Sequence, residues 1–480
     1  MRKKSKKNFL INMLSVVIGV LYLIIYILFV ALVIKLDTIP NKYLMFLIGV
    51  SILISVLILL VLFIKKIKRR IKIIFNIITI LLIGIYCFGI YYLSSTIDFV
   101  ENINKNKNEY EEYYVVVNKK SNFNNLKDIK GESIYVLKSN DEKYVNAQTK
   151  LYKKINISYK EAKSIDEIFK KLNESNIILI SSNTYSMLTE KDYNIGEFSK
   201  IIYVIKIKTK KNEITKGVNV CNTPFNIYIS GIDTSGNISK VARSDVNMVA
   251  TVNPITHEIL LTSIPRDYYV KLHSNGAYDK LTHTGVYGIN ESIFTIEDLL
   301  KIDINYYVRV NFTTVIDLVD VIGGVTVNSD YSFTTHGMGK KYSFVKGNND
   351  LNGQQALAFA RERKSFKDGD RQRIKNQQIV LTAILNKIMK SNMILSKYTN
   401  ILNTLEGSFD TNINPNDFKS IVKLQINDMP NWNIQKNSLS GNDSKAYTYT
   451  YGNQLLYVMK QNNESVQDAM EKINTILKNR

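Results

Sequence analysis

The chain has 480 residues, with 63 Lys and Arg against 42 Asp and Glu and a formal net charge of +21. Thirteen of the basic residues and a single acidic residue lie in residues 1–97, so +12 of the charge belongs to that segment and +9 to the remainder. A nucleic-acid-binding protein carries its basic excess on the folded domain, so we expect no nucleic-acid partner. Cys87 and Cys221 lie in different parts of the chain and are not expected to form a disulfide.

The N-terminal segment contains three long apolar stretches, at residues 9–34, 43–64 and 71–93. Each is long enough to cross about 30 Å of hydrocarbon as a helix. No small-residue cleavage site follows the first stretch, which argues against a removable signal peptide. The pattern predicts a membrane anchor with three transmembrane helices over residues 1–97.

The basic flanks of these stretches predict their orientation. MRKKSKK precedes the first stretch, KKIKRRIK joins the second to the third, and the short KLDTIPNK between the first two is nearly balanced. Basic loops stay in the cytoplasm. We therefore expect a multi-pass protein of the cell membrane, with a cytoplasmic N-terminus and everything after Leu93 outside.

Residues 98–221 have the pattern of a small extracellular α/β accessory domain. Strand-like runs such as YYVVVNKK, ESIYVL, NIILISS and IIYVIKI alternate with amphipathic stretches such as SIDEIFKKLNES. Residues 113–137 resemble the opening strand, helix and strand of a solute-binding-protein lobe. The polar, basic stretch at residues 206–222 predicts the end of this domain, for which a spacer role and a ligand site both stay open.

Strands and helices continue to alternate beyond residue 222. FNIYISGID predicts a buried strand, and VNMVATV, NPIT and HEILLTSI predict a strand, a turn and a strand. ESIFTIEDLLKI predicts an amphipathic helix, NYYVRVNF a strand, and TTVIDLVDVIGGVTV a helix, a turn and a strand. The expected fold is α/β, with a mixed central sheet sandwiched by helices in a catalytic domain core at residues 222–390. Residues 391–480 are expected to complete that domain.

Arginine and aspartate residues gather in four short blocks at the ends of these apolar runs. They are Asp233 in SGIDTSG, Arg243 and Asp245 in ARSD, Arg266 and Asp267 in SIPRD, and Arg361, Arg363 and Asp370 in ARERKSFKDGDRQR. An antiparallel pair with a short turn brings the ARSD block beside the PRD block. Guanidinium groups bind phosphate oxygens in pairs, and carboxylates hold a hard divalent cation. The blocks therefore predict a pyrophosphate site with Mg²⁺.

The last block predicts a helix, a strand, a polar loop and a long helix. Period-two spacing would point Arg361 and Arg363 the same way on the strand. Asp370 stands where the long helix needs an N-cap. Arg373 and Gln377 are four residues apart and share one face of that helix.

Together GID, ARSD, SIPRD, DKLTHTGVYG, VIGGV and ARERKSFKDGDRQRIKNQQ resemble the LytR-CpsA-Psr family of cell-envelope phosphotransferases, over residues 222–390. The three spans and the accessory domain further resemble its streptococcal capsule-type members. The resemblance implies a membrane-anchored enzyme that moves a glycopolymer, capsular polysaccharide or teichoic-acid-like, from an undecaprenyl-pyrophosphate carrier to peptidoglycan through a phosphodiester. The implied partners are that lipid-linked glycan, peptidoglycan and membrane lipid, with the polyprenyl chain in a hydrophobic channel.

The resemblance also implies roles for single residues. Asp233 and Asp245 would hold Mg²⁺ or Mn²⁺, Asp267 would orient Arg266, and Asp370 would orient Arg361 or Arg363. The implied catalytic residues are Arg243, Asp245 and Arg266, and the implied pyrophosphate contacts are Arg243, Arg266, Lys280, Arg361, Arg363, Arg373 and Gln377. The sequence departs from the family pattern at Asn376, where an arginine is common, and at Thr282 and His283, where small residues are common.

Other functions compete with this one. The four histidines show no metal-ligand spacing, and neither a Walker nor a GxGxxG loop occurs. A polyprenyl-pyrophosphate hydrolase, which uses water as acceptor, has the same site. A non-catalytic regulator or sensor of envelope polymer synthesis is the third hypothesis, and its transcriptional-attenuator form needs a cytoplasmic domain. Asp245 is our candidate general base.

Overall fold

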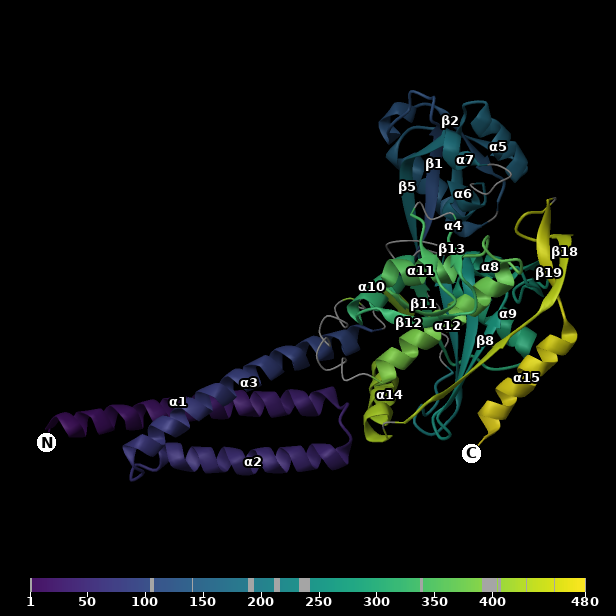
Figure 1. Ribbon diagram of the computed structural model, residues 1–480. Helices are drawn as coiled ribbons and strands as arrows, with labels where there is room; N and C mark the ends of the chain where they lie inside the picture. Colours follow the sequence, from purple (N-terminus) through teal and green to yellow (C-terminus); the bar gives the residue numbers. More distant parts are fainter. Residues whose placement is uncertain are drawn as a thin grey trace.

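The computed structural model describes residues 2–103, 108–139, 141–188, 194–210, 216–232, 242–336, 340–390, 404, 407–428, 430–452 and 454–479. Its N-terminal part consists of α1 (Arg2–Leu36), α2 (Asn41–Phe63) and α3 (Arg69–Asn102). Three segments, Phe9–Leu36, Asn41–Phe63 and Arg69–Asn102, are long and apolar enough to cross a membrane. The helices pack against one another and project from the rest of the chain (Figure 1). The three apolar stretches are therefore helices, as predicted, and α3 continues past Leu93.

Polar side chains join these helices in their interior. The hydroxyls of Tyr22 on α1 and Ser55 on α2 are 2.7 Å apart. Lys72 of α3 donates from Nζ to Oδ1 of Asn12 on α1 at 2.9 Å. Such hydrogen bonds hold helices together where lipid supplies no hydrophobic driving force.

The segment after α3 forms a separate α/β unit. Its elements are β1 (Asn108–Asn118), η1 (Leu126–Ile129), β2 (Ser133–Leu137), α4 (Glu142–Lys154), β3 (Ser158–Ala162), α5 (Ile165–Asn173), β4 (Ile177–Ser181), α6 (Ser182–Leu188), α7 (Ile195–Phe198) and β5 (Ser199–Lys210). The strands form one sheet in the order β3-β2-β4-β1-β5, in which β2, β3 and β4 are parallel and β1 is antiparallel to its neighbours. Alternate residues of β1 point to opposite faces, so Val115 packs toward α4 and Val116 toward α5.

The second α/β unit is built on a six-stranded sheet. Its strands are β6 (Phe225–Ile232), β7 (Ser244–Asn253), β8 (Glu258–Ile264), β11 (Tyr306–Asn311), β16 (Phe409–Thr411) and β17 (Asn433–Ser438). They lie in the order β16-β11-β6-β7-β8-β17. The pairs β11–β6 and β17–β8 are parallel, and the other pairs are antiparallel. The predicted mixed sheet is confirmed.

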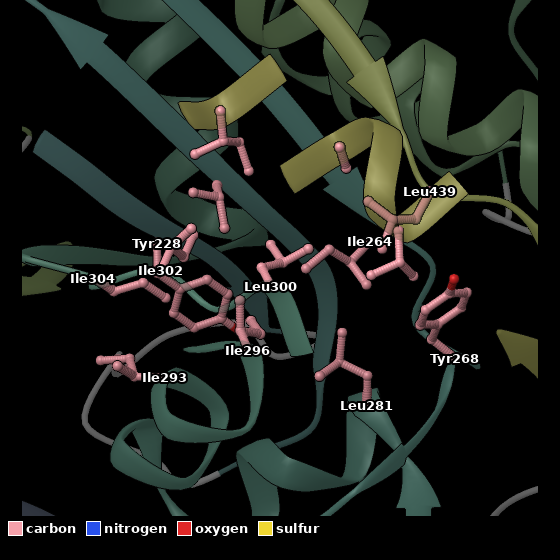
Figure 2. Close-up of a cluster of buried hydrophobic side chains, with 14 of the residues drawn as sticks. Tyr228, Ile264, Tyr268, Leu281, Ile293, Ile296, Leu300, Ile302, Ile304 and Leu439 are labelled. Atoms are coloured by element: carbon pink, nitrogen blue, oxygen red, sulfur yellow. The ribbon is translucent and has the colours of Figure 1, made fainter. Parts of the chain in front are cut away.

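Helices cover both faces of this sheet (Figure 1). They are α8 (Leu281–Thr284), η2 (Gly285–Tyr287), α9 (Ile289–Leu300), α10 (Phe312–Val321), α11 (Gly353–Arg361), α12 (Asp370–Lys390), α14 (Pro415–Asp428) and α15 (Asn463–Lys478). Figure 2 shows the main core, in which Tyr228 and Ile264 of the sheet face Ile293, Ile296 and Leu300 of α9. Residues of α15 complete this cluster, while α12 packs on the opposite face through Leu381.

Short strand pairs surround the sheet. They are β9 (Tyr269–Lys271) with β10 (Tyr278–Lys280), β12 (Val325–Ser329) with β15 (Gly347–Leu351), β13 (Phe333–Thr334) with β14 (Ser343–Phe344), and β18 (Gly441–Tyr447) with β19 (Leu455–Gln461). Gly323 and Gly324 join α10 to β12 with φ of 78° and 80°. A side chain strains this conformation, and a Cβ on Gly324 would lie 2.8 Å from the carbonyl oxygen of Leu351. These glycines therefore make the reversal that the sequence predicts.

The C-terminal ends of α1 and α3 contact the second α/β unit. Phe99 of α3 is buried against Phe418 of α14, with ring centres 5.9 Å apart, and Phe409 of β16 joins the cluster. Lys423 of α14 donates from Nζ to Oδ1 of Asp37, just after α1, at 2.6 Å. An apolar contact and an ion pair therefore fix the anchor at the β16 edge of the sheet.

Candidate active site

The β7–β8 hairpin brings two of the charged blocks together. Asn247 of β7 pairs with Ile264 of β8, so the residues just before Asn247 lie opposite those just after Ile264. Nη1 of Arg266 donates to Oδ2 of Asp245 at 2.7 Å. The proximity of the ARSD and PRD blocks predicted from an antiparallel hairpin is confirmed for Asp245 and Arg266.

Asp245 is the centre of a small hydrogen-bonded group. Its Oδ2 accepts from Arg266, and its Oδ1 accepts from the hydroxyl of Thr282 at 3.1 Å. The side chains of Asp245 and Arg266 are each 17% exposed. Thr282 is one of the positions that depart from the family pattern, and here it fixes the second carboxylate oxygen.

Asp267 holds two cations. Its Oδ1 accepts from Nζ of Lys280 at 2.9 Å, and its Oδ2 lies 3.6 Å from Nε of Arg266. Burial raises the pKa of Asp267, but the positive charges of Arg266, Lys280 and Arg373 outweigh burial, and the pKa is lower than usual. Asp267 is therefore a carboxylate at neutral pH and lies where it can orient Arg266.

Arg361 and Arg363 do not lie on a strand, so the prediction of a shared strand face was wrong. Arg361 is the last residue of α11, and Arg363 lies in the loop that follows. Asn352 caps α11 in a reciprocal pair of hydrogen bonds with Gln355, and residues 356–359 are buried. The cap starts the helix, and the run of Ala, Leu and Phe residues that follows continues it to Arg361.

Asp370 is the first residue of α12 rather than its N-cap, which corrects a second prediction. Its Oδ1 lies 3.2 Å from Nη2 of Arg373 and 3.7 Å from Nη1 of Arg363. The guanidinium carbon of Arg361 lies 3.9 Å from the ring centre of Phe312. An acid in the first turn is also favoured by the helix dipole. Asp370 thus combines a helix-start position with contacts to two arginines.

Arg373 is almost fully buried, with 8% of its surface exposed. Its Nε has no hydrogen-bond partner among the residues that the structure describes. Burial lowers the pKa of Arg373 and the charges of Arg266 and Arg363 lower it further, while Asp370 and Asp245 oppose the shift. A guanidinium group stays protonated in proteins. The fold therefore holds this positive charge at an energetic cost that a bound anion would relieve.

The remaining predicted site residues lie around this group or outside the described chain. Asp233 lies outside the described residues. Arg243 is half-buried immediately before β7. Gln377 is half-buried one turn beyond Arg373, and within the described ranges no hydrogen bond joins it to the site residues. Gln377 is thus the predicted contact with the least structural support.

Asn376 has a structural contact at the position where relatives often carry arginine. It is buried, accepts from Gln372 at 3.1 Å and donates to the carbonyl of Phe359 on α11 at 3.2 Å. It therefore ties α12 to α11.

A buried pair beside Lys280 escaped the sequence analysis. Oδ1 of Asp279 lies 2.5 Å from Nδ1 of His283, and Oδ2 accepts from the backbone nitrogen of Thr450 at 2.9 Å. Burial raises the pKa of Asp279, but the contacts with His283, Thr450 and the Lys280 backbone outweigh it and the pKa is lowered. The i,i+4 spacing of Asp279 and His283 was the available sequence signal. This pair fixes the backbone that carries Lys280 and Thr282.

The described residues supply oxygen ligands for a hard cation at Asp245. Its carboxylate lies beside the hydroxyl of Thr282. Within the described ranges, no group of three or more His, Cys, Asp or Glu that could hold a metal occurs. Mg²⁺ takes one or two carboxylates and completes its shell with water and phosphate oxygens. Among the described residues Asp245 supplies one carboxylate of such a set, beside the Thr282 hydroxyl.

Comparisons with known proteins identify the family of this chain. The model of the LytR_cpsA_psr family matches residues 192–472. The polyisoprenyl-teichoic acid–peptidoglycan teichoic acid transferase TagU of Bacillus mycoides (strain KBAB4) is 33% identical over 261 residues, covering 53% of this chain and 82% of that protein. TagU of Bacillus subtilis (strain 168) is 35% identical over 207 residues, covering 43% of this chain and 65% of that protein.

Solved structures include similar chains. The crystal structure of B. subtilis TagV is 26% identical and aligns with a TM-score of 0.46, covering 54% of this chain and 99% of that one. The family match extends over more than half of the chain and spans the described charged groups from Arg243 to Arg373. The chain belongs to the LytR-CpsA-Psr family.

Proposed function

We propose that this chain is a phosphotransferase that moves a glycopolymer from a polyisoprenyl-pyrophosphate carrier to peptidoglycan. Arg373 carries the proposal, because it is buried beside Arg266 and Arg363 and its Nε has no partner in the described part of the chain. Cations held together against desolvation favour a multiply charged anion. Family membership, and the polyisoprenyl-teichoic acid and peptidoglycan in the names of the TagU relatives, support a lipid-linked pyrophosphate as that anion.

The placement of these charges supports the following reaction. Arg266, Lys280 and Arg373 neutralise phosphate oxygens, and Asp245 and Asp267 hold Arg266 and Lys280 in position before the substrate binds. A hydroxyl oxygen of the acceptor sugar attacks the phosphorus nearest the glycopolymer, and a new P–O bond forms. The bond from that phosphorus to the bridging oxygen breaks, polyisoprenyl phosphate leaves with that oxygen, and the hydroxyl proton passes to Asp245 or to water. Fixed charges accelerate such transfer mainly by positioning and neutralisation.

Mg²⁺ is part of the proposal, with Asp245 and Asp233 as its carboxylate ligands. When bound, it would neutralise further charge on the pyrophosphate. Both oxygens of Asp245 already accept hydrogen bonds, from Arg266 and Thr282. A role of Asp245 as general base therefore requires one of these bonds to be released.

The proposal also places the two α/β units outside the cell membrane. Three helices long enough to span a membrane precede them. The basic segments before α1 and between α2 and α3 favour the cytoplasm by the positive-inside rule. An odd number of spans then leads to the outside.

The test is product formation by the full chain in lipid nanodiscs. The protein is incubated with Mg²⁺, a short lipid-pyrophosphate-linked glycan and peptidoglycan oligomers, and mass spectrometry detects a phosphodiester-linked product. Arg266→Ala is expected to lower the rate about 100-fold or more, because one electrostatic contact of this kind is worth that much. Lys375→Ala, at an exposed position of α12, is the matched control and is expected to keep the wild-type rate.

The products separate the competing hypotheses. Phosphodiester-linked product that disappears with Arg266→Ala supports the transferase. Free glycan phosphate without linked product indicates the hydrolase. Binding of the lipid-linked glycan with neither product indicates the regulator.

A further inference from the structure

Two exposed strand hairpins beside the active site carry aromatic side chains on one face each. In the β9–β10 hairpin Tyr269 is opposite Lys280, and Tyr278 is opposite Lys271. Paired residues share a face, and alternate residues along a strand share it too. These two tyrosines and two lysines therefore lie on the same face of the hairpin.

The β18–β19 hairpin repeats this pattern. Tyr447 is opposite Leu455, and Lys445 is opposite Tyr457. These four side chains share one face for the same reason. We call Tyr269, Tyr278, Tyr447, Leu455 and Tyr457 the aromatic platform.

Hydrogen bonds join the two hairpins. The hydroxyl of Tyr269 donates to the carbonyl of Tyr447 at 2.8 Å, and the backbone nitrogen of Tyr449 donates to the carbonyl of Tyr278 at 3.0 Å. Gln461 donates from Nε2 to the carbonyl of Tyr269 at 2.9 Å. The rings of Tyr269 and Tyr278 are stacked with centres 5.0 Å apart. The rings of Tyr269 and Tyr278 are thus held in place before any ligand arrives.

The aromatic platform is open to solvent. Tyr447 and Leu455 are more than half exposed, at 57% and 53%, and Tyr278 and Tyr457 are 45% and 40% exposed. Large apolar side chains gathered at one exposed place mark an interaction site. Figure 1 shows the β18–β19 hairpin on the side of the second α/β unit opposite α1–α3. This location argues against a membrane surface as the occupant.

The aromatic platform continues into the active site. Nζ of Lys280 lies 2.9 Å from Oδ1 of Asp267 and 5.9 Å from the ring centre of Tyr457. Burial, followed by Asp443, Asp267 and Asp370, raises the pKa of Tyr457, so the site carboxylates Asp267 and Asp370 act on this ring. A ligand on the rings would therefore reach the groups that bind the pyrophosphate.

We propose that the aromatic platform binds the sugar rings of the acceptor, a glycan strand of peptidoglycan. The proposal rests on the transferase function above. The negative face of a tyrosine ring attracts the positively polarised C–H groups of a pyranose, and a rigid ring loses little entropy on binding. The lipid-linked donor reaches the site from the membrane, whereas the hairpins lie on the side away from the anchor. The glycan strand of peptidoglycan, which comes from the cell wall, thus meets the aromatic platform and presents its hydroxyl beside Lys280.

The test uses the full chain in nanodiscs and a hexasaccharide of alternating β-1,4-linked N-acetylglucosamine and N-acetylmuramic acid. Calorimetry measures binding without donor. The double change Tyr278→Ala with Tyr447→Ala is expected to weaken binding about tenfold, because each stacked ring contributes a modest amount. Tyr278→Phe with Tyr447→Phe keeps both rings and is expected to bind as the wild type does. All variants should show the same melting temperature and the same stabilisation by inorganic pyrophosphate.

The kinetic readout is the KM for peptidoglycan oligomers in the transfer assay. The alanine pair is expected to raise this KM and leave the KM for the lipid-linked donor unchanged. The inference is overturned if the alanine pair and the phenylalanine pair bind the hexasaccharide equally well. It is also overturned if the alanine pair keeps hexasaccharide binding and instead loses binding to poly(glycerol phosphate) or to anionic vesicles. Hexasaccharide binding that depends on the rings, without any transfer product, upholds the inference and refutes the proposed function. Transfer product with hexasaccharide binding that does not depend on the rings supports the proposed function and refutes the inference.

Discussion

Replacing Arg373 with methionine is expected to make the unliganded protein more stable and unable to respond to pyrophosphate. Arg373 forms an ion pair with Asp370, and burial and the charges of Arg266 and Arg363 lower its pKa. A base whose folded pKa is lowered destabilises the fold while it stays charged. Methionine is apolar and of similar length, so it removes the charge and keeps most of the packing.

The magnitude follows from opposing effects at this site. Nη2 of Arg373 lies 3.2 Å from Oδ1 of Asp370. At that distance an effective dielectric constant of 20 gives an attraction of about 5 kcal/mol. Desolvation of a buried ion costs several kcal/mol, and repulsion by two arginines adds to it, so the lowered pKa gives the sign of the balance. We expect Arg373→Met to raise the free energy of unfolding by about 1–2 kcal/mol, or the melting temperature by about 2–8 °C.

The assay is thermal unfolding of the full chain with and without inorganic pyrophosphate. At 100 times its Kd the anion stabilises the wild type by about 2.7 kcal/mol, which is a shift of about 5–10 °C. A 100-fold weaker Kd in the variant reduces this to about 0.4 kcal/mol.

Arg309 supplies the matched control. It is 2% exposed, and its Nη2 lies 3.2 Å from Oδ2 of Asp410. Removal of one partner of a buried pair leaves the other charge uncompensated and costs about 3–5 kcal/mol. Arg309→Met is therefore expected to destabilise the protein and keep the pyrophosphate response. If Arg373→Met is less stable than the wild type and still responds to pyrophosphate, Arg373 stabilises the fold and does not bind the anion, and the prediction is refuted.

Three further predictions test the charge pairs and the anchor. Asp267 has a lowered pKa in the folded state, so the stability it contributes is present above about pH 4 and is lost as the pH falls through the folded pKa. Between pH 5 and 3 the melting temperature of the wild type should therefore fall more than that of Asp267→Asn. Phe99→Ala removes a buried ring and costs about 3 kcal/mol at the contact with α14, so amide exchange in α14 should quicken, whereas Phe88→Ala, at an exposed position of α3, should leave it unchanged. Protease added outside intact cells should remove the chain after α3, and a fully protected chain would contradict the proposed orientation.

The parts of the site that sequence predicted correctly are those set by local geometry. The strand, turn and strand of residues 244–264 leave one arrangement for their flanks, so the contact of Asp245 with Arg266 followed from the pattern. The position of Arg361 did not follow from the pattern, because two arginines two residues apart fit a strand. In the structure a helix begins after the Asn352 cap and ends at Arg361. The edge strand β3 was missed since its polar sequence SYKEA lacks alternation. Its partner β2 was found from the apolar run in ESIYVL.

Contacts between distant segments were beyond the reach of the sequence. Arg373 takes its properties from Arg266, Asp245 and Arg363, which come from other elements, and no periodicity in α12 encodes that meeting. Packing of the sheet on α12 determines which arginine is buried. Arg309 is a second example. The pattern of NYYVRVNF predicts an ordinary strand residue at this position, whereas in the structure Arg309 forms an ion pair with Asp410 of β16.

The sheet also gives the reaction a spatial order. The anchor contacts the β16 edge through Phe409, and the charged groups cluster at the β7–β8 hairpin, three strands away in the order β16-β11-β6-β7. Of the hairpins with the aromatic platform, β9–β10 follows β8 and β18–β19 follows β17, the strand beside β8. Lys280 links both hairpins to the charged groups, through Asp267 and the Tyr457 ring. An in-line displacement needs the leaving lipid phosphate and the attacking sugar hydroxyl on opposite sides of one phosphorus. A fold that joins its anchor to one sheet edge and its proposed sugar-binding rings to the other side of the charged site (Figure 1) would bring the two substrates to that phosphorus from opposite sides.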